Sequence, residues 1–349
     1  MEMQSTPPSF VERFFKVREK GSTVRTELLA GMTTFIAMAY ILFVNPNILA
    51  DAGIPKEAAI ASTIWIAALA SLAMGIFANY PVALAPGMGL NAFFAYYVCG
   101  VLGLHWTVAL GAVFFSGVLF LILTVGGIRQ AIINAVPRDL KYAISVGIGL
   151  FIAFIGLKGT GLIVENSATY VSLGHVTAPM TLLSLFGLLL TAALMARNVH
   201  GSILIGIFVT TILAMILGMT PAPKGITDIV STSLPHMGET FGQLDLAGAW
   251  HYGLVSIIFT FTVVELFDNM GTLIGLTTKA KMVRPDGHIE NIDKALTTDA
   301  VGTMVSAMFG TSTVTSYIES AAGIAAGGRT GLTAVAAGVL FLAALLFTP

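Results

Sequence analysis

Two carboxylates lie inside the apolar stretch Phe259-Thr260-Phe261-Thr262-Val263-Val264-Glu265-Leu266-Phe267-Asp268-Asn269-Met270-Gly271-Thr272. On a helix, Glu265 and Asp268 are three residues apart and therefore share a face. An acidic residue near the bilayer midplane costs about 2.5 to 3.5 kcal/mol on insertion scales. Two acids on one face predict water, a ligand, a proton or a partner beside them. The alternative is a helix end among the headgroups, or a structural polar contact between helices.

The composition indicates an integral membrane protein. Of the 349 residues, 56% are hydrophobic and 10% are charged, and the mean hydropathy is +0.88. Soluble domains carry about 25% charged residues. Helices of about 20 apolar residues are the natural spanning unit. Cys99 is the single cysteine, which excludes an intramolecular disulfide and a cysteine-based metal cluster.

Eleven apolar segments are predicted to cross the membrane. They lie at about 28–50, 58–79, 82–99, 106–126, 140–160, 178–196, 201–219, 251–276, 294–309, 311–327 and 330–348. With the N-terminus inside, 14 of the 17 lysines and arginines fall on the inner side. The positive-inside rule therefore predicts a cytoplasmic N-terminus.

This count predicts four parts along the chain. Residues 1–27 form a basic cytoplasmic segment, and residues 28–219 form a first set of seven spans. Residues 220–250 form an extracytoplasmic loop. Residues 251–349 then begin a second set with spans eight to eleven.

The third and tenth spans are predicted to be interrupted. The third carries Pro86, Gly87 and Gly89 in its middle, where a proline removes a donor and glycines permit unusual backbone angles. We expect extended backbone up to about Gly87 and a half-helix from Gly89 or Leu90 onward. The tenth opens with a β-favouring run of Thr, Ser and Val at 311–316. Non-helical backbone at membrane depth is tolerated only where it is buried in protein or lines a cavity.

The two interrupted spans are seven apart, which is the pattern of a transporter built from two repeats. Seven is odd, so the second copy is expected to be inverted. A complete second copy needs fourteen spans, and the sequence is therefore expected to be C-terminally incomplete. The predicted fold class is an all-α polytopic membrane protein with inverted seven-span repeats and short strands in spans three and ten. The alternative is eleven spans without a repeat.

Polar groups converge on these predicted breaks. Half-helix N-termini present unpaired N–H groups, and extended backbone presents carbonyls. Such a site suits a flat, polar, neutral heterocycle. Glu265 and Glu319 can accept N–H bonds from its edge. Asn91 can donate and accept, and Gly89 lets the backbone approach a ligand.

The same acids suggest proton coupling. Burial disfavours a charged carboxylate, so at least one of Glu265, Asp268 and Glu319 is predicted to take up a proton. The residues leave open which one does. Asp299 opens the ninth span and is predicted to make a helix-end or loop contact. No metal site or cofactor is predicted, because the histidines fall in loops or at span ends.

Four stretches resemble one transporter family. They are MTTFIAMAYILFVNP at 32–46, APGMGLNAFF at 85–94, ELFDNMGTL at 265–273 and YIESAAG at 317–323. They resemble the AzgA-like purine permeases of the nucleobase/ascorbate transporter group, also called the nucleobase–cation symporter-2 family. The similarity runs from about Gly21 to the end of the sequence.

The resemblance implies fourteen spans with a core domain and a gate domain. It also implies alternating access and proton-coupled uptake of hypoxanthine, guanine or adenine across the bacterial inner membrane. By position, Gly89 and Asn91 match the third-span motif, Glu265 and Asp268 the eighth-span acidic pair, and Glu319 the tenth-span acid. The first acid of that pair is often Asp in the family and is Glu here, which leaves the particular purine open.

The implied partners are a purine nucleobase and membrane lipid, with a homodimer left open and no nucleic acid. Two other functions compete with a proton–purine symporter. One is an anion or other small-solute transporter of the same architecture. An anion site would need an intramembrane Lys or Arg, whereas this chain places acids there. A membrane-embedded enzyme or receptor would need a nucleophile–base pair, a metal set or a sizeable soluble domain, and the sequence shows none of these.

Overall fold

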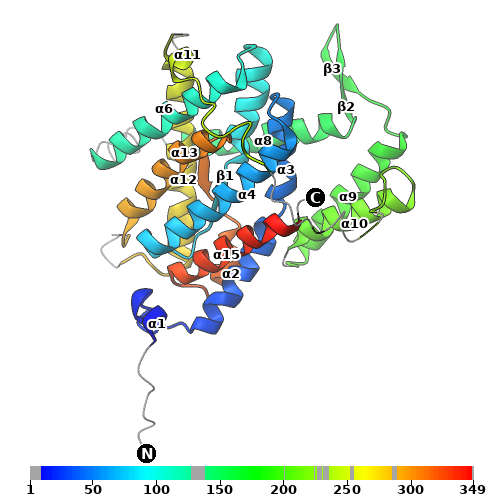
Figure 1. The fold of residues 1–349 in the computed structure, drawn as a ribbon. Helices are drawn as coiled ribbons and strands as arrows, with labels where there is room; N and C mark the ends of the chain where they lie inside the picture. The colour runs from blue at the N-terminus through cyan, green and yellow to red at the C-terminus, as the bar shows by residue number, and fades with distance from the viewer. Residues whose placement is uncertain are drawn as a thin grey trace, which may run out of the picture.

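The computed structural model describes residues 9–126, 138–199, 201–223, 236–251, 255–284 and 289–347, with residues 225 and 230 (Figure 1). Residues 1–8 of the predicted N-terminal segment and most of 224–235 in the predicted loop lie outside this range. The first part of the chain forms α1 (Phe10–Phe14), α2 (Val24–Met38), α3 (Ile41–Asp51), α4 (Lys56–Ala73), η1 (Met74–Ala78), β1 (Leu84–Pro86), α5 (Met88–Ala92), η2 (Phe93–Val101), α6 (Trp106–Val125) and α8 (Arg138–Gly159).

The second part of the chain begins with a hairpin and continues mainly as helices. Its elements are β2 (Ile163–Asn166), β3 (Tyr170–Leu173), α9 (Pro179–Ala196), α10 (Ser202–Ile216), α11 (Leu246–His251), α12 (Val255–Lys279), α13 (Ile292–Phe309), β4 (Val314–Ser316), α14 (Ser320–Ala325), α15 (Gly331–Ala344) and η4 (Leu345–Phe347).

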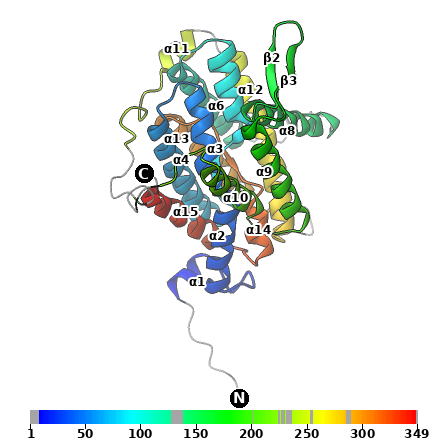
Figure 2. The same cartoon turned by 90° about the vertical axis from the view of Figure 1, so that its right-hand side faces the viewer.

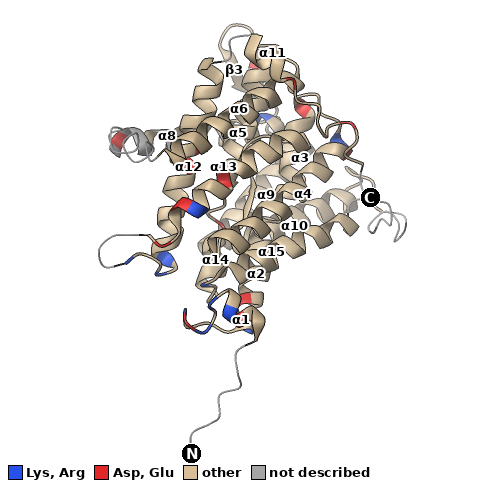
Figure 3. Cartoon of the chain, turned by 60° about the vertical axis from the view of Figure 1, so that its left-hand side comes forward, with Lys and Arg blue, Asp and Glu red and all other residues tan. Residues whose placement is uncertain are grey.

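Several helices have the length and composition of membrane spans. Within the described ranges, five are long and apolar enough to cross a bilayer, and they run over Val24–Asp51, Lys56–Ala78, Trp106–Val125, Pro179–Ala196 and Val255–Lys279. Further apolar helices are shorter, among them Met88–Val101 and Ser202–Ile216. Charged residues gather at helix ends, with Lys and Arg concentrated near α1, while the body of the helices is largely uncharged (Figure 3). These features are those of a multi-pass membrane protein.

The two strands β1 and β4 lie where the sequence predicts extended backbone in the third and tenth spans. They pair antiparallel, with Leu84 opposite Ser316 and Pro86 opposite Val314, and both are fully buried. Each strand is followed by a short helix, α5 and α14. Helix α5 begins at Met88, one residue earlier than predicted. The ribbon therefore joins two chain segments that lie more than 200 residues apart.

A buried two-stranded ribbon leaves backbone groups on its outer edges, and side chains from neighbouring helices satisfy them. The Ser71 hydroxyl accepts from the Leu84 N–H at 2.9 Å and donates to the Leu84 carbonyl oxygen at 3.0 Å. The Ser320 hydroxyl accepts from the Ala83 N–H at 3.0 Å, and Thr303 accepts from the Val314 N–H at 3.1 Å. Because an unpaired N–H in an apolar interior costs several kcal/mol, these hydroxyls make the ribbon possible at membrane depth.

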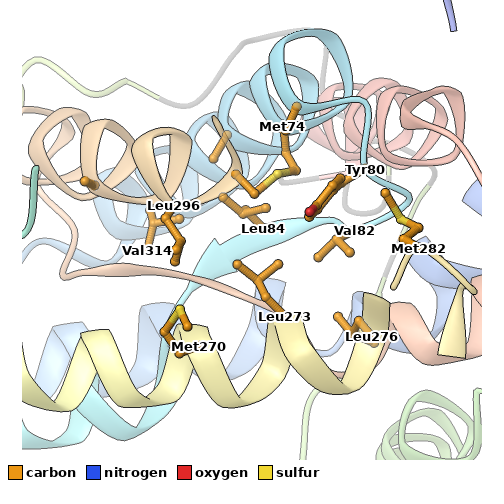
Figure 4. Close-up of a cluster of buried hydrophobic side chains, with 14 of the residues drawn as sticks. Met74, Tyr80, Val82, Leu84, Met270, Leu273, Leu276, Met282, Leu296 and Val314 are labelled. Carbon is orange, nitrogen blue, oxygen red and sulfur yellow. The ribbon is translucent and has the colours of Figure 1, made fainter. Parts of the chain in front are cut away.

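Helix α12 packs its apolar residues against the ribbon. Figure 4 shows Met270, Leu273 and Leu276 of α12 facing Leu84 and Val82 across a buried cluster. In a bilayer, lipid tails are as apolar as these side chains, so the gain comes from close packing rather than from removal of water. This contact brings the acidic stretch of α12 next to the ribbon.

Small residues let α15 approach the end of the second span closely. A Cβ placed on Gly331 would lie 2.0 Å from the Gly75 carbonyl oxygen, and a Cβ placed on Gly75 would lie 2.4 Å from the Gly331 carbonyl oxygen. The two backbones are thus in direct contact, which only glycine permits on both sides.

Helices α9 and α10 pack on each other and stand beside the rest of the molecule (Figure 1). The segment between the predicted spans 140–160 and 178–196 is more ordered than the all-α fold class implies. Strands β2 and β3 form an antiparallel hairpin there, with Ile163 opposite Leu173 and Asn166 opposite Tyr170. The hairpin is mostly exposed.

The N-terminal segment is anchored to the body through α15. Figure 2 shows α1 below α2 and α15. Phe15 and Val17 are buried against Leu332, and the Asn79 amide donates to the Phe15 carbonyl oxygen at 3.0 Å. Burial lowers the pKa of the nearby Lys20 ammonium, while the carboxylates of Glu290 and Glu27 oppose that change.

Glu27→Ala is expected to lower the free energy of unfolding by about 3 kcal/mol or more, because three donors lose a buried acceptor. The Glu27 carboxylate accepts from the backbone N–H groups of Arg329 at 3.0 Å and Thr330 at 3.2 Å, and from the Thr333 hydroxyl at 2.5 Å. Thermal unfolding in detergent measures the loss. Glu57→Ala, at an exposed glutamate of α4, is the control and should change stability by less than about 0.5 kcal/mol. Equal losses in both variants would contradict this role.

Candidate functional site

The ribbon of β1 and β4 marks the centre of the candidate site. Helix α12, which carries Glu265 and Asp268, packs against both β4 and α14. Helix α5, which carries Gly89 and Asn91, follows β1 directly and also contacts α12. Glu319 stands between β4 and α14. The structure thus brings together the elements that hold all five residues predicted from the sequence.

Glu265 is fully buried and is held by the neighbouring helix α13. The Thr303 hydroxyl of α13 donates to Oε1 of Glu265, while the same hydroxyl accepts from β4. The other carboxylate oxygen, Oε2, has no hydrogen-bond partner among the described residues. Glu265 therefore keeps one buried acceptor available.

Asp268 lies one turn further along α12 and differs from Glu265 in being exposed. The Thr315 hydroxyl of β4 lies 3.0 Å from Asp268 Oδ2 and 2.8 Å from Asn269 Oδ1. Asn269 also accepts from the Ser316 N–H at 2.8 Å. The pair Asp268–Asn269 therefore binds the outer edge of β4 and ties the strand to α12.

Glu319 is partly buried and is paired with a tyrosine from the first span. The Tyr40 hydroxyl donates to Glu319 Oε1 at 2.6 Å. Tyr40 stands at the junction of α2 and α3. The neighbouring Tyr317 hydroxyl donates to the Pro86 carbonyl oxygen at 2.5 Å and so links the two interrupted segments again.

Asn91 is fully buried, and its amide nitrogen donates to Oδ1 of Asn45 on α3. Its own Oδ1 has no hydrogen-bond partner among the described residues. The approach of the backbone to a ligand at Gly89 stays a prediction, and a close contact within the protein occurs at Gly87. A Cβ placed on Gly87 would lie 2.9 Å from Cγ2 of Thr315.

The prediction that Asp299 makes a helix-end or loop contact is wrong. Asp299 is fully buried within α13, which begins at Ile292, two turns earlier. The Ser316 hydroxyl of β4 lies 3.1 and 3.3 Å from its two carboxylate oxygens. The span predicted at 294–309 already contains Asp299, so the error concerns its contact. Its partner Ser316 comes from β4, a segment that the sequence does not place beside α13.

Sequence reasoning also misses several polar partners. Asn45, Tyr40, Thr303 and Asn269 each hold a predicted site residue or the strand beside it. The rule that selects Glu265, a polar group inside an apolar span, also applies to Asn45 and Asp299. The threonine and the tyrosine carry no comparable signal, because both are common in spans.

Two cavities lie away from these carboxylates. One of about 690 Å³ lies between α4 and α13 and is lined mainly by apolar side chains, among them Ile66, Phe77 and Val301. Another of about 650 Å³ is bordered by Asp51, Tyr96 and other residues of α3, η2 and α8. Neither borders Glu265 or Glu319. Over the described ranges, no three His, Cys, Asp or Glu side chains gather in a way that could hold a metal ion.

Sequence comparison identifies close relatives over nearly the whole chain. The model of the permease family (Xan_ur_permease) matches residues 25–349. A putative permease of Methanocaldococcus jannaschii is 52% identical over 97% of this chain and 77% of its own length. The adenine permease AdeP of Escherichia coli is 45% identical over 99% and 77%, respectively. The guanine/hypoxanthine permease PbuO of Bacillus subtilis is 42% identical over 96% and 78%.

Structural comparison finds the same fold in other membrane transporters. The transmembrane domain of the cyanobacterial bicarbonate transporter BicA superposes with a TM-score of 0.64 at 15% identity, over 92% of this chain and 82% of that one. The murine anion transporter Slc26a9 superposes with a TM-score of 0.62 at 10% identity, over 99% and 61%. At these identities the likeness concerns the fold alone. The match to the family model and the sequence relatives show that the chain belongs to the permease family and is a membrane transporter, not an enzyme.

Proposed function

We propose that this protein imports purine nucleobases by proton symport. The permeases that it resembles at 45% and 42% identity are named for adenine and for guanine and hypoxanthine. A purine is flat and neutral and carries both N–H donors and ring-nitrogen acceptors. The candidate site offers carboxylate and amide oxygens as acceptors, and the first backbone N–H groups of α5, which has no side-chain N-cap, as donors.

The observation that carries this proposal is the pair of buried acceptors without partners beside the ribbon. Glu265 Oε2 and Asn91 Oδ1 are both buried and unpaired among the described residues. A buried polar atom without a partner is costly, and a ligand N–H would satisfy it. In this proposal Glu265 and Glu319 accept from the purine edge, while Gly89 and Asn91 line its other side.

Access to the site requires movement in this proposal. Glu265 is fully buried, so a purine reaches it only after neighbouring segments separate. We assign the movement to alternating access between a core domain and a gate domain, built from inverted seven-span repeats. The membrane is the bacterial inner membrane, with the N-terminus cytoplasmic.

Uptake of radiolabelled adenine, hypoxanthine and guanine into cells that express the full-length protein tests the function. Accumulation of at least one purine, its release by a protonophore and competition by unlabelled purines are expected. If no purine enters, the proposal fails. If a purine enters but a protonophore leaves uptake unchanged, proton symport is wrong and nucleobase transport stands.

Asp268→Asn is expected to separate purine binding from proton coupling. Of Glu265, Asp268 and Glu319, Asp268 has the most exposed side chain, which makes it our candidate for proton exchange. Asparagine retains an acceptor for Thr315 and removes the proton site. Counterflow exchange of labelled purine should survive, while accumulation driven by a pH gradient should fall by about tenfold or more. Wild-type accumulation in Asp268→Asn would place the coupling proton elsewhere.

A further inference from the structure

A chain of hydrogen bonds runs from the backbone of α4 to Asn91 and determines which end of the Asn91 amide is free. It begins at Thr63, whose Oγ1 lies 2.6 Å from the Ala59 carbonyl oxygen. A carbonyl oxygen has no proton, so the single hydroxyl proton of Thr63 occupies this contact. Thr63 Oγ1 is therefore an acceptor toward every other neighbour.

The acceptor on Thr63 fixes the orientation of the Asn45 amide, which in turn fixes that of Asn91. One end of the Asn45 amide lies 2.8 Å from Thr63 Oγ1 and 3.3 Å from Thr311 Oγ1. The end that faces an acceptor must be the NH₂ group, so the Asn45 oxygen faces the other way. That oxygen accepts from the amide nitrogen of Asn91. Thr63, Asn45 and Asn91 are all fully buried, and water does not compete for these bonds.

The last atom of this chain is the oxygen of Asn91, which has no hydrogen-bond partner among the described residues. It lies on α5, which packs against α12. The ring of Phe93, two residues further on, meets the ring of Phe261 edge to face at 5.2 Å between centroids. Phe261 is one helical turn before Glu265. Asn91 is therefore at the level of the candidate site.

We propose that Asn45 is a positioning residue that holds Asn91 with its amide oxygen toward the ligand. The site then selects nucleobases that carry an N–H donor at this position. This inference rests on the proposed transport of nucleobases. A ligand with an acceptor or a methyl group at that position leaves the buried oxygen unpaired, and such mismatches are penalised strongly.

Competition experiments on vesicles that contain the full-length protein test this role. The competitors are purine analogues in which each N–H is removed or methylated in turn. For the wild type, at least one analogue should bind about 10- to 100-fold more weakly than its parent purine. For Asn45→Ala the difference should shrink to about threefold or less, because the Asn91 amide can turn and offer either end.

Two further variants separate orientation from general damage. Asn45→Asp should keep the discrimination, because a carboxyl group offers Asn91 an accepting oxygen in either protonation state. Asn47→Ala is the matched control. Asn47 lies on the same helix but is exposed and donates only to the Phe43 carbonyl oxygen at 2.8 Å. Asn47→Ala should discriminate between the parent purines and their analogues as strongly as the wild type does.

The inference is overturned if Asn45→Ala reaches the membrane and retains the wild-type discrimination, or if Asn47→Ala loses it as well. If Asn45→Ala does not reach the membrane, Thr63→Val replaces it. Valine removes the acceptor that orients Asn45, with Thr63→Ser as its control. Purine uptake without discrimination against any analogue overturns this inference alone. Absence of all uptake by the wild type overturns the proposed function and this inference with it.

Discussion

Glu265→Gln is expected to reduce purine uptake by about 100-fold or more. Glutamine keeps the volume of the side chain and can still accept from Thr303 through its oxygen. The buried position that holds Oε2 in the native protein then carries an NH₂ group. The glutamine NH₂ group is a donor, so it cannot accept a hydrogen bond from the ligand N–H. Unlike the carboxylate of Glu265, the amide also cannot take up a coupling proton. Initial rates of labelled purine uptake, normalised to the amount of protein in the membrane, measure the effect.

The same change at an exposed position serves as the control. Glu57→Gln, on the exposed face of α4, should retain uptake within about twofold of the wild type. Glu319→Gln should also lose uptake, because it weakens the acceptor of the Tyr40 hydroxyl and the proposed acceptor of the purine edge. Normal rates in Glu265→Gln or Glu319→Gln, with normal membrane insertion, would remove that residue from the site.

Gly331→Val is expected to prevent accumulation of folded protein. A Cβ at this position would lie 2.0 Å from the Gly75 carbonyl oxygen, 2.7 Å from the Gly75 carbonyl carbon and 2.9 Å from Asn79 Cα. These neighbours are backbone atoms and cannot turn aside, so α15 would have to move away from η1. Overpacking a well-packed interior costs about 1 to 3 kcal/mol even where side chains can adjust, and this contact exceeds that case.

Fluorescence-detected size-exclusion chromatography of a tagged protein measures this effect as loss of the monodisperse peak. Gly275→Val is the matched control, since a Cβ on Gly275 of α12 meets no atom within 4 Å. It should retain the peak, with a loss of no more than about 1 kcal/mol in stability. If both variants behave alike, the close approach of Gly331 to Gly75 does not limit folding.

Local features of the sequence predict much of the secondary structure. The helices α6, α9 and α12, and α4 together with η1, begin and end within a few residues of the predicted apolar spans. The Pro86–Gly87 pair and the β-favouring run at 311–316 predict extended backbone where β1 and β4 occur. Each of these signals acts within a few residues of the chain: apolar composition over one span, or the loss of a donor at one proline.

Contacts between distant residues are not visible in the same way. The sequence does not predict the hairpin of β2 and β3, and it does not predict the contact of Asp299, because its partner Ser316 lies on β4, a separate segment brought beside α13 only by the fold. The hydrogen-bond chain Thr63–Asn45–Asn91 joins three different elements, and no periodicity along the sequence predicts it.

The sequence by itself determined the membrane class, the positions of the apolar helices, the two interruptions and the unusual acids of α12. Only the tertiary structure decided that β1 pairs with β4, that Thr303 holds Glu265, and that the amide oxygen of Asn91 is left free. The physical reason is that hydropathy and backbone preference are properties of neighbouring residues. The direction of a hydrogen bond, in contrast, depends on which donor and acceptor close packing brings within 3 Å of each other.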